Sequence, residues 1–311
     1  MAPEPLLAIV GPTTSGKTLA AIAIAARLEA EIVSVDSMLV YRGMDVGTAK
    51  PSPAEMAGVP HHLIDVAEPS ESFSVARYQT LGTAVLRETA ARGRPVLLAG
   101  GSGLYYRALV DDLEFPGTDP DTRELLEGEA GIVGADAMYM RLAELDPVGA
   151  AKIEPANVRR TIRALEVAAI TGRRFSSFAT AWERYPDGHV RAAGLAIPRE
   201  VLDTRARSRV FAMLEAGLLG EVRGLLERGF GGWFTSSQAI GYAEFALHLQ
   251  GQLSLEDAVE RTVRRTKNLA RRQEAWFRRD PRIRWFEAET PGGSDVIDAV
   301  CAYLGSVLET A

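Results

Sequence analysis

The stretch Gly11-Pro12-Thr13-Thr14-Ser15-Gly16-Lys17-Thr18 decides the fold of this chain. It fits the pattern G-x-x-x-x-G-K-[ST], in which glycines let backbone amides turn toward an anion and the lysine adds a positive charge. The apolar residues 6–10 before it predict a buried strand, and residues 19–28 after it predict a helix. Because a helix N-terminus also attracts anions, we expect this loop to bind a phosphorylated ligand, with the Thr18 hydroxyl placed to ligate Mg²⁺.

The composition is that of an ordinary globular protein. The chain has 311 residues, 47% of them hydrophobic and 24% charged, which allows one large domain or two modest ones. Its one cysteine, Cys301, excludes a disulfide framework and a cysteine zinc cluster, so we expect a cytoplasmic location. We find no signal peptide and no apolar run long enough to span a bilayer, so we expect no membrane partner.

Positive charge is concentrated near the C-terminus. Residues 261–284 carry ten Arg or Lys against two acids, a local balance of +8 within a net charge of −6. One face of a predicted helix there carries Arg261, Arg264, Arg265 and Arg272. Charge of one sign repels itself unless a polyanion meets it, so the pattern favours a nucleic-acid surface over the alternative of a solvated charged face.

Short apolar segments predict the strands of a parallel sheet. They are residues 6–10, 31–35, 95–99 and 192–197, with a predicted helix over residues 74–92. Strands that alternate with helices are typical of an α/β fold whose parallel sheet is covered on both faces. The loop that follows the first strand then lies at the carboxyl end of the sheet, where such folds bind ligands.

The alternation of strands and helices is interrupted in the middle of the chain. Helical apolar spacing is found instead over residues 121–129, 135–145 and 157–171. We therefore predict a phosphate-loop α/β core over residues 1–116 and 191–311, with a helical insertion over residues 117–190. The alternative is that these helices merely cover the sheet. The C-terminal part is predicted as helices over residues 203–228, 242–250 and 255–279, a strand over 283–287 and a helix from Asp295.

Further candidate residues follow two of the strands. Asp36 ends the second strand, where it could hold Mg²⁺, accept a proton from an attacking group or cap a turn. Gly100-Gly101-Ser102-Gly103 follows the third strand, and it could bring a ligand close to the backbone or make an ordinary strand-to-helix connection. The histidines show no spacing typical of a metal site.

Together, the motifs resemble those of the tRNA dimethylallyltransferase (tRNA isopentenyltransferase) family, in its compact bacterial form. The matching stretches occur in family order over nearly the whole chain: residues 11–18, 35–51 (VDSMLVYRGMDVGTAKP), 61–65 (HHLID), 100–105 (GGSGLY), 163–167 (RALEV), 238–242 (QAIGY) and 271–273 (RRQ). The block over residues 36–51 is far more specific than the phosphate loop.

The resemblance implies a reaction and a set of site residues. A dimethylallyl group would pass from dimethylallyl diphosphate to N6 of the adenine at position 37 of tRNA, beside the anticodon. Residues 11–18 would bind the diphosphate, and the catalytic residues would be Lys17, Thr18 with Mg²⁺, Arg205 and the general base Asp36. The residues implied to bind tRNA are Asp36, Ser37, Met38, Leu39, Ser102, Arg123, Arg159, Arg160, Thr161, Ile162 and Arg163. Of these, Ser102 and Arg123 would lie near the flipped nucleotide, and residues 159–163 would lie on the anticodon stem-loop.

Other functions stay open at this point. The loop is also typical of ATP-binding kinases, and a kinase of a small metabolite would use Asp36 as the base for an acceptor hydroxyl. An adenylate isopentenyltransferase would act on a free nucleotide, and a nucleotide-gated RNA-binding module would have no catalytic activity. The basic clusters favour a tRNA substrate. We expect a monomer.

Overall fold

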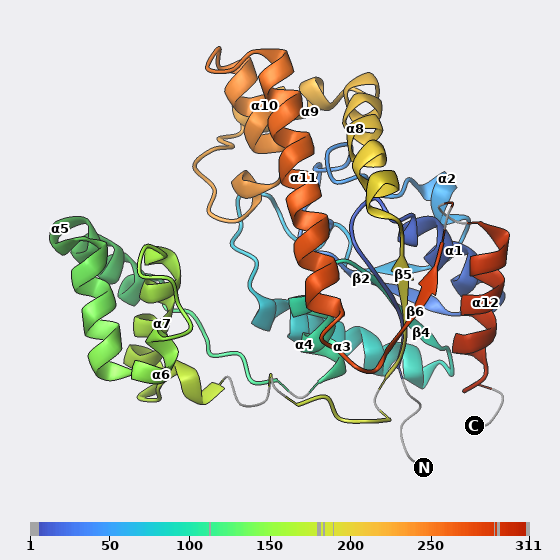
Figure 1. Ribbon diagram of the computed structural model, residues 1–311, viewed down its shortest axis with the longest axis horizontal. Helices are drawn as coiled ribbons and strands as arrows, with labels where there is room; N and C mark the ends of the chain where they lie inside the picture. The colour runs from blue at the N-terminus through green and yellow to red at the C-terminus, as the bar shows by residue number, and fades with distance from the viewer. Residues whose placement is uncertain are drawn as a thin grey trace. The chain divides into compact units, whose positions relative to one another are not determined.

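A parallel β-sheet forms the centre of the larger part of the chain (Figure 1). The computed structural model describes residues 6–111, 113–178, 182, 184–188, 190–288, 290 and 293–308. Within those residues, six strands form one sheet in the order β3-β2-β4-β1-β5-β6. They are β1 (Leu6–Val10), β2 (Glu31–Val35), β3 (His61–His62), β4 (Val96–Gly100), β5 (Val190–Ala196) and β6 (Ile283–Glu287). Neighbouring strands are parallel throughout, so the predicted α/β fold is confirmed.

The first strand lies inside the sheet, between β4 and β5. Val10 is in register with Gly100 on one side and with Gly194 on the other, and Val35 is also in register with Gly100. The segments that follow β1, β2 and β4 therefore leave the sheet side by side at the point where the strand order changes direction. Gly100 has to be glycine there, because a Cβ atom would lie 2.1 Å from Val35 O.

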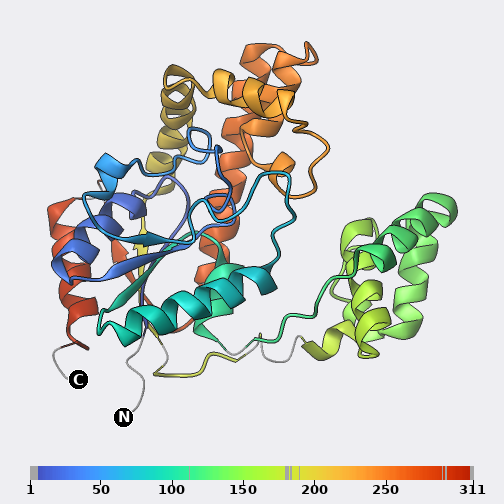
Figure 2. The same cartoon turned by 180° about the vertical axis from the view of Figure 1, so that it is seen from behind.

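Helices cover both faces of this sheet (Figures 1 and 2). One face carries α1 (Lys17–Arg27) and α12 (Ser294–Gly305), and the other carries α3 (Val75–Ala91) and α4 (Gly103–Val110). Both the strands and the helices contribute apolar side chains to the core beneath α1. They include Leu7, Ile9, Ile24, Val300 and Leu304. Burial of these side chains fixes the helix that begins at the phosphate loop.

Further helices make up most of the C-terminal part: α8 (Arg199–Glu215), α9 (Leu218–Glu227), α10 (Tyr242–Leu249) and α11 (Leu255–Phe277). The sequence predicts one helix over residues 203–228, but Gly217 adopts a left-handed φ of 95° and separates α8 from α9. α11 packs against α8 and α10 and reaches α4 beside the sheet. It thereby brings the basic segment of the sequence to the carboxyl end of the strands (Figure 1).

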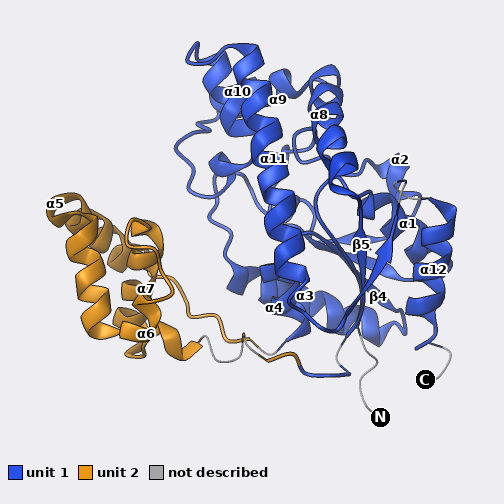
Figure 3. Cartoon of the chain, viewed as in Figure 1, with its two compact units in different colours: residues 1–111, 186–311 blue, residues 112–185 orange. Residues whose placement is uncertain are grey.

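Residues 112–185 form a second compact unit, separate from residues 1–111 and 186–311 (Figure 3). Its helices are α5 (Pro120–Leu145), α6 (Pro147–Ala150) and α7 (Val158–Thr171). They enclose an apolar core of their own that includes Leu126, Met138, Leu142, Ile162 and Leu165. α5 breaks at Gly134, whose φ of 85° and ψ of 169° are not helical. The unit is divided from the core at residues 112 and 186, five residues before the predicted boundaries at 117 and 191.

Several short elements escape the sequence prediction. They include the strand β3 and the helices α2 (Pro53–Met56), α4 and α6. Two or four residues are too few to show a period, and α4 begins in the glycine-rich turn that the sequence suggests is a loop. No helix among the described residues is long and apolar enough to cross a membrane.

Candidate active site

The phosphate loop wraps around the N-terminus of α1. Thr14 and Gly16 adopt left-handed φ values of 67° and 83°, a backbone geometry that turns amides toward the inside of the loop. Lys17 is the first residue of α1, and its Nζ donates a hydrogen bond to Pro12 O at 3.2 Å. Loop amides, an ammonium group and the positive end of a helix therefore converge on one place, where an anion can bind.

Lys17 lies beside another cation and a carboxylate. Burial lowers the pKa of Lys17 to about 8, an effect that the Asp36 carboxylate opposes and that Arg209 strengthens. Burial also lowers the pKa of Arg209, and again Asp36 opposes the shift. This part of the site therefore carries an excess of positive charge that a bound anion can balance.

Arg209 is not among the site residues that the sequence predicts. Its guanidinium donates to Thr13 Oγ1 at 3.3 Å and to Thr48 O at 3.0 Å, and so joins the phosphate loop to the segment after β2. Arg209 could have been predicted from its distance in sequence to Arg205. The two arginines are four residues apart, so they lie on one face of α8. The predicted Arg205 lies in the same region, and its buried Nη1 has no partner among the described residues.

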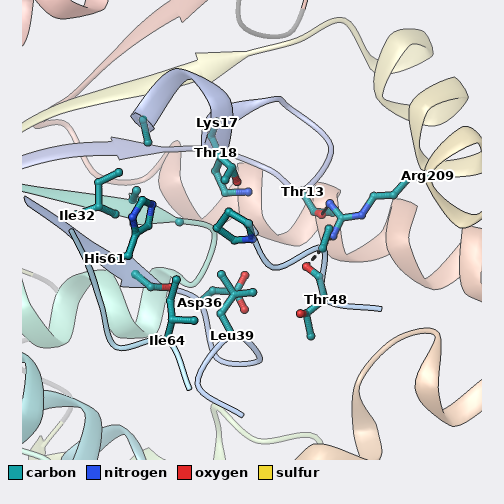
Figure 4. A pocket seen from close by; sticks show the side chains of 16 residues that line it. Thr13, Lys17, Thr18, Ile32, Asp36, Leu39, Thr48, His61, Ile64 and Arg209 are labelled. Atoms are coloured by element: carbon teal, nitrogen blue, oxygen red, sulfur yellow. Dashed lines mark hydrogen bonds between the residues drawn. The ribbon is translucent and has the colours of Figure 1, made fainter. Parts of the chain in front are cut away.

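In the described part of the chain, three cavities meet at the loop. The junction cavity, about 60 Å³, contains Lys17 and Asp36 (Figure 4). The outer cavity, about 600 Å³, lies between the loop and α8, and the α11 cavity, about 270 Å³, lies between Asp36 and α11. The junction cavity shares Lys17, Thr18, Ala49, Pro51 and Arg209 with the outer cavity. It shares Thr13, Asp36, Thr48 and Arg209 with the α11 cavity. It is therefore the place where the contents of the two larger cavities can meet.

Asp36 stands directly after β2, where it lines both the junction cavity and the α11 cavity. Its Oδ1 accepts a hydrogen bond from Met38 N at 2.8 Å, so the turn-capping role is present. This bond uses one carboxylate oxygen and fixes the side chain, which leaves the other oxygen for a ligand.

The turn after β4 serves the packing of α11. Ser102 Oγ accepts a hydrogen bond from Tyr105 N at 3.4 Å and caps α4, and Ser102 lines none of the three cavities. A Cβ atom on Gly101 would lie 2.4 Å from Gln273 Nε2. The turn therefore makes an ordinary strand-to-helix connection, and Gly100 at its start also lines the junction cavity.

Comparison with known proteins shows which family this chain belongs to. The family model described as IPP transferase matches residues 39–280. A tRNA dimethylallyltransferase of Kineococcus radiotolerans is 50% identical over 300 residues, which cover 94% of this chain and 93% of the relative. A tRNA dimethylallyltransferase of Thermobifida fusca is 48% identical over 303 residues, which cover 96% of this chain and 93% of the relative. The chain belongs to the tRNA dimethylallyltransferase family.

Solved structures of related enzymes share the fold over nearly the whole chain. The tRNA isopentenylpyrophosphate transferase of Bacillus halodurans is 41% identical, with a TM-score of 0.73 and coverage of 99% of this chain and 98% of that one. A eukaryotic dimethylallyltransferase acting on tRNA is 26% identical, with a TM-score of 0.81 and coverage of 96% and 78%. The resemblance inferred from the motifs is confirmed.

The residues expected to bind RNA in a tRNA dimethylallyltransferase lie in different surroundings. In the core unit, Ser37 and Met38 line the α11 cavity, and Leu39 lines the junction cavity. In the insertion, Arg159 and Arg160 are exposed on α7. These positions are compatible with RNA contact through their side chains.

Other members of the predicted set hold the insertion together. Arg123 and Arg163 both form ion pairs with the fully buried Glu166, and Arg163 also donates to Pro116 O and Gly117 O at 2.6 and 2.9 Å. These arginines are engaged in protein contacts, and a role toward RNA would come in addition to them.

Two residues of the same cluster need a correction. Thr161 and Ile162 are 0% and 4% exposed, and Ile162 belongs to the apolar core of the insertion. Their side chains face inward because α7 buries one side against α5, so any contact of these two residues with RNA would have to be made by the backbone. A run of basic residues in the sequence does not reveal which of its members turn inward.

The basic face of α11 also differs from the prediction at one position. Arg261, Arg264 and Arg272 are exposed, as a nucleic-acid surface of a tRNA dimethylallyltransferase requires. Arg265, however, pairs with the buried Glu244 and donates to Gln238 O at 3.1 Å. Arg265 therefore joins α11 to the segment before it.

The metal prediction depends on Thr18. This residue is exposed in the first turn of α1 and lines both the junction and the outer cavity. No group of three or more His, Cys, Asp or Glu that could hold a metal occurs among the described residues. A hydroxyl beside a phosphate site suits Mg²⁺, which usually takes most of its ligands from water and from the phosphates.

Proposed function

We propose that this enzyme transfers the dimethylallyl group of dimethylallyl diphosphate to N6 of the adenine at position 37 of tRNA, next to the anticodon. The sequence relationship to tRNA dimethylallyltransferases supports the reaction class. The observation that supports the mechanism is the position of Asp36 between a cationic cavity and the α11 cavity. A diphosphate donor and an acceptor base can meet there from two sides.

The donor diphosphate binds in the outer cavity. The phosphate loop provides amides, and positive charge comes from Lys17, Arg205 and Arg209, which all line this cavity. The unpartnered, buried Nη1 of Arg205 supports this placement, because a buried donor is costly without an acceptor and a phosphate oxygen provides one.

The acceptor adenine binds in the α11 cavity. A base within a stacked loop must leave the stack before its N6 can be reached, and this cavity of about 270 Å³ opens beside Asp36. The exposed arginines of α11 supply charge for the RNA backbone near the same cavity, which Arg272 helps to line.

The reaction replaces one bond with another. The N6 lone pair attacks C1 of the dimethylallyl group, so that the C1–N6 bond forms and the C1–O bond to the diphosphate breaks. Asp36 accepts the proton that N6 loses, through the oxygen that Met38 N leaves free. The electron pair of the broken bond stays on the diphosphate, where Lys17 and the arginines of α8 stabilise it.

Mg²⁺ is the proposed metal of this site, and the Thr18 hydroxyl would hold it together with donor oxygens and water. When bound, it supplies further positive charge to the leaving diphosphate. Lys17, Arg205 and Arg209 provide the same kind of stabilisation from the protein itself. We also propose a cytoplasmic monomer, which size-exclusion chromatography with light scattering would check.

A product assay tests the proposal. The protein is incubated with tRNA, dimethylallyl diphosphate and Mg²⁺ in the absence of ATP, and each RNA digest is analysed by mass spectrometry. We expect one prenyl group on the adenine next to the anticodon. Phosphate transfer from ATP, prenylation of free AMP alone or binding without any product would support the kinase, the adenylate prenyltransferase or the RNA-binding module instead.

A further inference from the structure

The junction cavity has a polar end and an apolar end. Figure 4 shows Thr13, Thr48 and Arg209 on one side, and Ile32 with His61 on the other. The apolar residues that line the cavity are Ala21, Ile32, Leu39, Ala49, Pro51, Ile64 and Ala99, and the buried Ser34 hydroxyl, which has no partner among the described residues, also belongs to the lining. A group that enters from the cationic outer cavity therefore meets a hydrocarbon surface beyond Lys17 and Asp36.

The small size of this cavity favours a short hydrocarbon group. Its volume, polar end included, is about 60 Å³, only a few times the roughly 10–15 Å³ that one water molecule needs. A dimethylallyl group has five carbon atoms, whereas the ten carbons of a geranyl group need about twice the room. The outer cavity, about 600 Å³, would hold either group.

The apolar end is built from fixed elements. Ile32 is 3% exposed and lies in β2, in register with His61 of β3 and Leu97 of β4. His61 donates its Nδ1–H to Val59 O at 2.8 Å. Burial lowers the pKa of His61, so the ring is neutral near pH 7 and does not add charge to the cavity. This end is therefore rigid and largely apolar, with the His61 ring and the Ser34 hydroxyl as its polar groups.

Ile64 closes the cavity on the side of the loop after β3. Its neighbour Asp65 is held twice, because Asp65 N donates to Leu39 O at 3.1 Å and the Asp65 carboxylate accepts from Lys50 Nζ at 2.5 Å. The Lys50 side chain is 5% exposed and the Asp65 side chain 45% exposed, so the ion pair is shielded from water only on the side of the lysine. The loop that carries Ile64 is thus anchored twice to the segment after β2, which contains both Leu39 and Lys50.

We infer that the junction cavity measures the length of the donor's prenyl chain, and that Ile64 is the residue that limits it to five carbons. The inference rests on the proposed function, because it assigns the hydrocarbon part of the proposed donor. Ile64 is a better determinant than Ile32, since Ile64 is only half-buried in a loop while Ile32 belongs to the buried centre of the sheet.

The test compares donors of two lengths. Single-turnover transfer to tRNA is measured with dimethylallyl diphosphate and with geranyl diphosphate, for the unmodified enzyme and for Ile64→Ala, Ile64→Val and Ile64→Phe. We expect the unmodified enzyme to prefer the five-carbon donor at least about 100-fold. Ile64→Ala should raise the geranyl-to-dimethylallyl ratio about tenfold or more, and Ile64→Val should raise it less. Ile64→Phe should slow the five-carbon reaction while tRNA affinity stays unchanged.

Ile297→Ala is the matched control, because Ile297 is a buried isoleucine of α12 that lines none of the three cavities. Its donor ratio should equal that of the unmodified enzyme. Comparable rates with both donors in the unmodified enzyme would overturn the inference and place the tail in the outer cavity. An unchanged ratio in folded Ile64→Ala and Ile64→Val would also overturn it. Absence of any transfer from dimethylallyl diphosphate would instead overturn the proposed function.

Discussion

Gln273 accepts, through its side-chain Oε1, a hydrogen bond from the backbone amide of Thr13 at 2.7 Å. This bond joins α11 to the phosphate loop across 260 positions of the sequence. The same helix carries the exposed Arg264 and Arg272. The proposed RNA surface and the proposed diphosphate site are therefore connected directly, through a side chain that takes up one amide of the loop.

Gln273→Glu should weaken donor binding while leaving the fold intact. Glutamate still accepts from Thr13 N, but its negative charge stands beside the proposed diphosphate site, so we expect donor affinity to fall at least about tenfold. Gln273→Ala instead leaves the Thr13 amide without its partner and should lower stability by about 1–3 kcal/mol. Calorimetric titration with the donor and thermal unfolding distinguish the two effects. Equal donor affinity in Gln273→Glu and the unmodified enzyme would place the diphosphate elsewhere.

The charge of Lys17 should appear in the pH dependence of donor binding. Its pKa is about 8 in the free enzyme, and a bound diphosphate favours the charged form, so binding raises this pKa. Affinity should therefore be level between pH 7 and 8 and then fall, by up to about tenfold per pH unit, until the pKa of the bound state is reached. Binding titrations with the donor between pH 7 and 10 measure this decline in affinity.

Lys17→Met provides the control for that experiment. It should bind the donor more weakly at pH 7 and lose the decline above pH 8. A wild-type curve that runs parallel to the Lys17→Met curve would show that another group is responsible for the decline.

Asp36→Asn separates proton transfer from positioning. The amide oxygen of asparagine can still accept the hydrogen bond from Met38 N, so the turn should persist. The side chain can no longer take up a proton, and we expect the single-turnover rate to fall about 10²–10⁴-fold with tRNA affinity nearly unchanged. Loss of tRNA binding with a normal chemical step would make Asp36 a positioning residue.

The exposed arginines of α11 should contribute to the salt dependence of tRNA binding. Neutralising Arg264 and Arg272 to glutamine removes two cations, and the slope of log K against log salt should become shallower by about 0.7–0.9 for each phosphate that the helix no longer neutralises. Fluorescence titrations at several salt concentrations measure the slope. An unchanged slope would indicate a solvated charged face.

Arg265→Gln is a comparison variant on the same helix, at a residue that pairs with Glu244 and also lines the α11 cavity. It removes the partner of the buried Glu244, so it should lower the midpoint of thermal unfolding more than the substitution of Arg264 does. If Arg265→Gln instead changed the salt slope and left stability intact, the ion pair with Glu244 would be of little consequence.

The parts of the fold that the sequence predicts correctly are those marked by a pattern of apolar residues within one short segment. Residues 6–10, 31–35 and 283–287 are strands as predicted, because each is a short apolar run bounded by loop residues. The helices of the insertion follow from apolar spacing in the same way, including the break at Gly134. The sequence merges α8 and α9 into one predicted helix, since a glycine in a helical pattern is often tolerated and only its φ shows the break.

The candidate site is predictable only in part. Lys17 and Asp36 belong to segments with a recognisable order of strand, loop and helix. Arg209 depends on a fold that brings α8 to the loop, and the burial of Thr161 depends on how α7 packs against α5. The position of Arg209 and the burial of Thr161 both result from tertiary packing. No local pattern in a single sequence predicts how distant segments pack.

The order of the strands has a consequence for the growing chain on the ribosome. β1 is synthesised first, yet its neighbours in the sheet are β4 and β5, and Leu6 pairs with Val190. The strand that leads into the phosphate loop is therefore completed on both sides only after about two thirds of the protein has emerged, and Gln273 reaches the loop later still. Pairings this distant in sequence form slowly. A partly made chain consequently lacks an assembled centre, and a tRNA at the ribosome meets an active enzyme only when synthesis is almost finished.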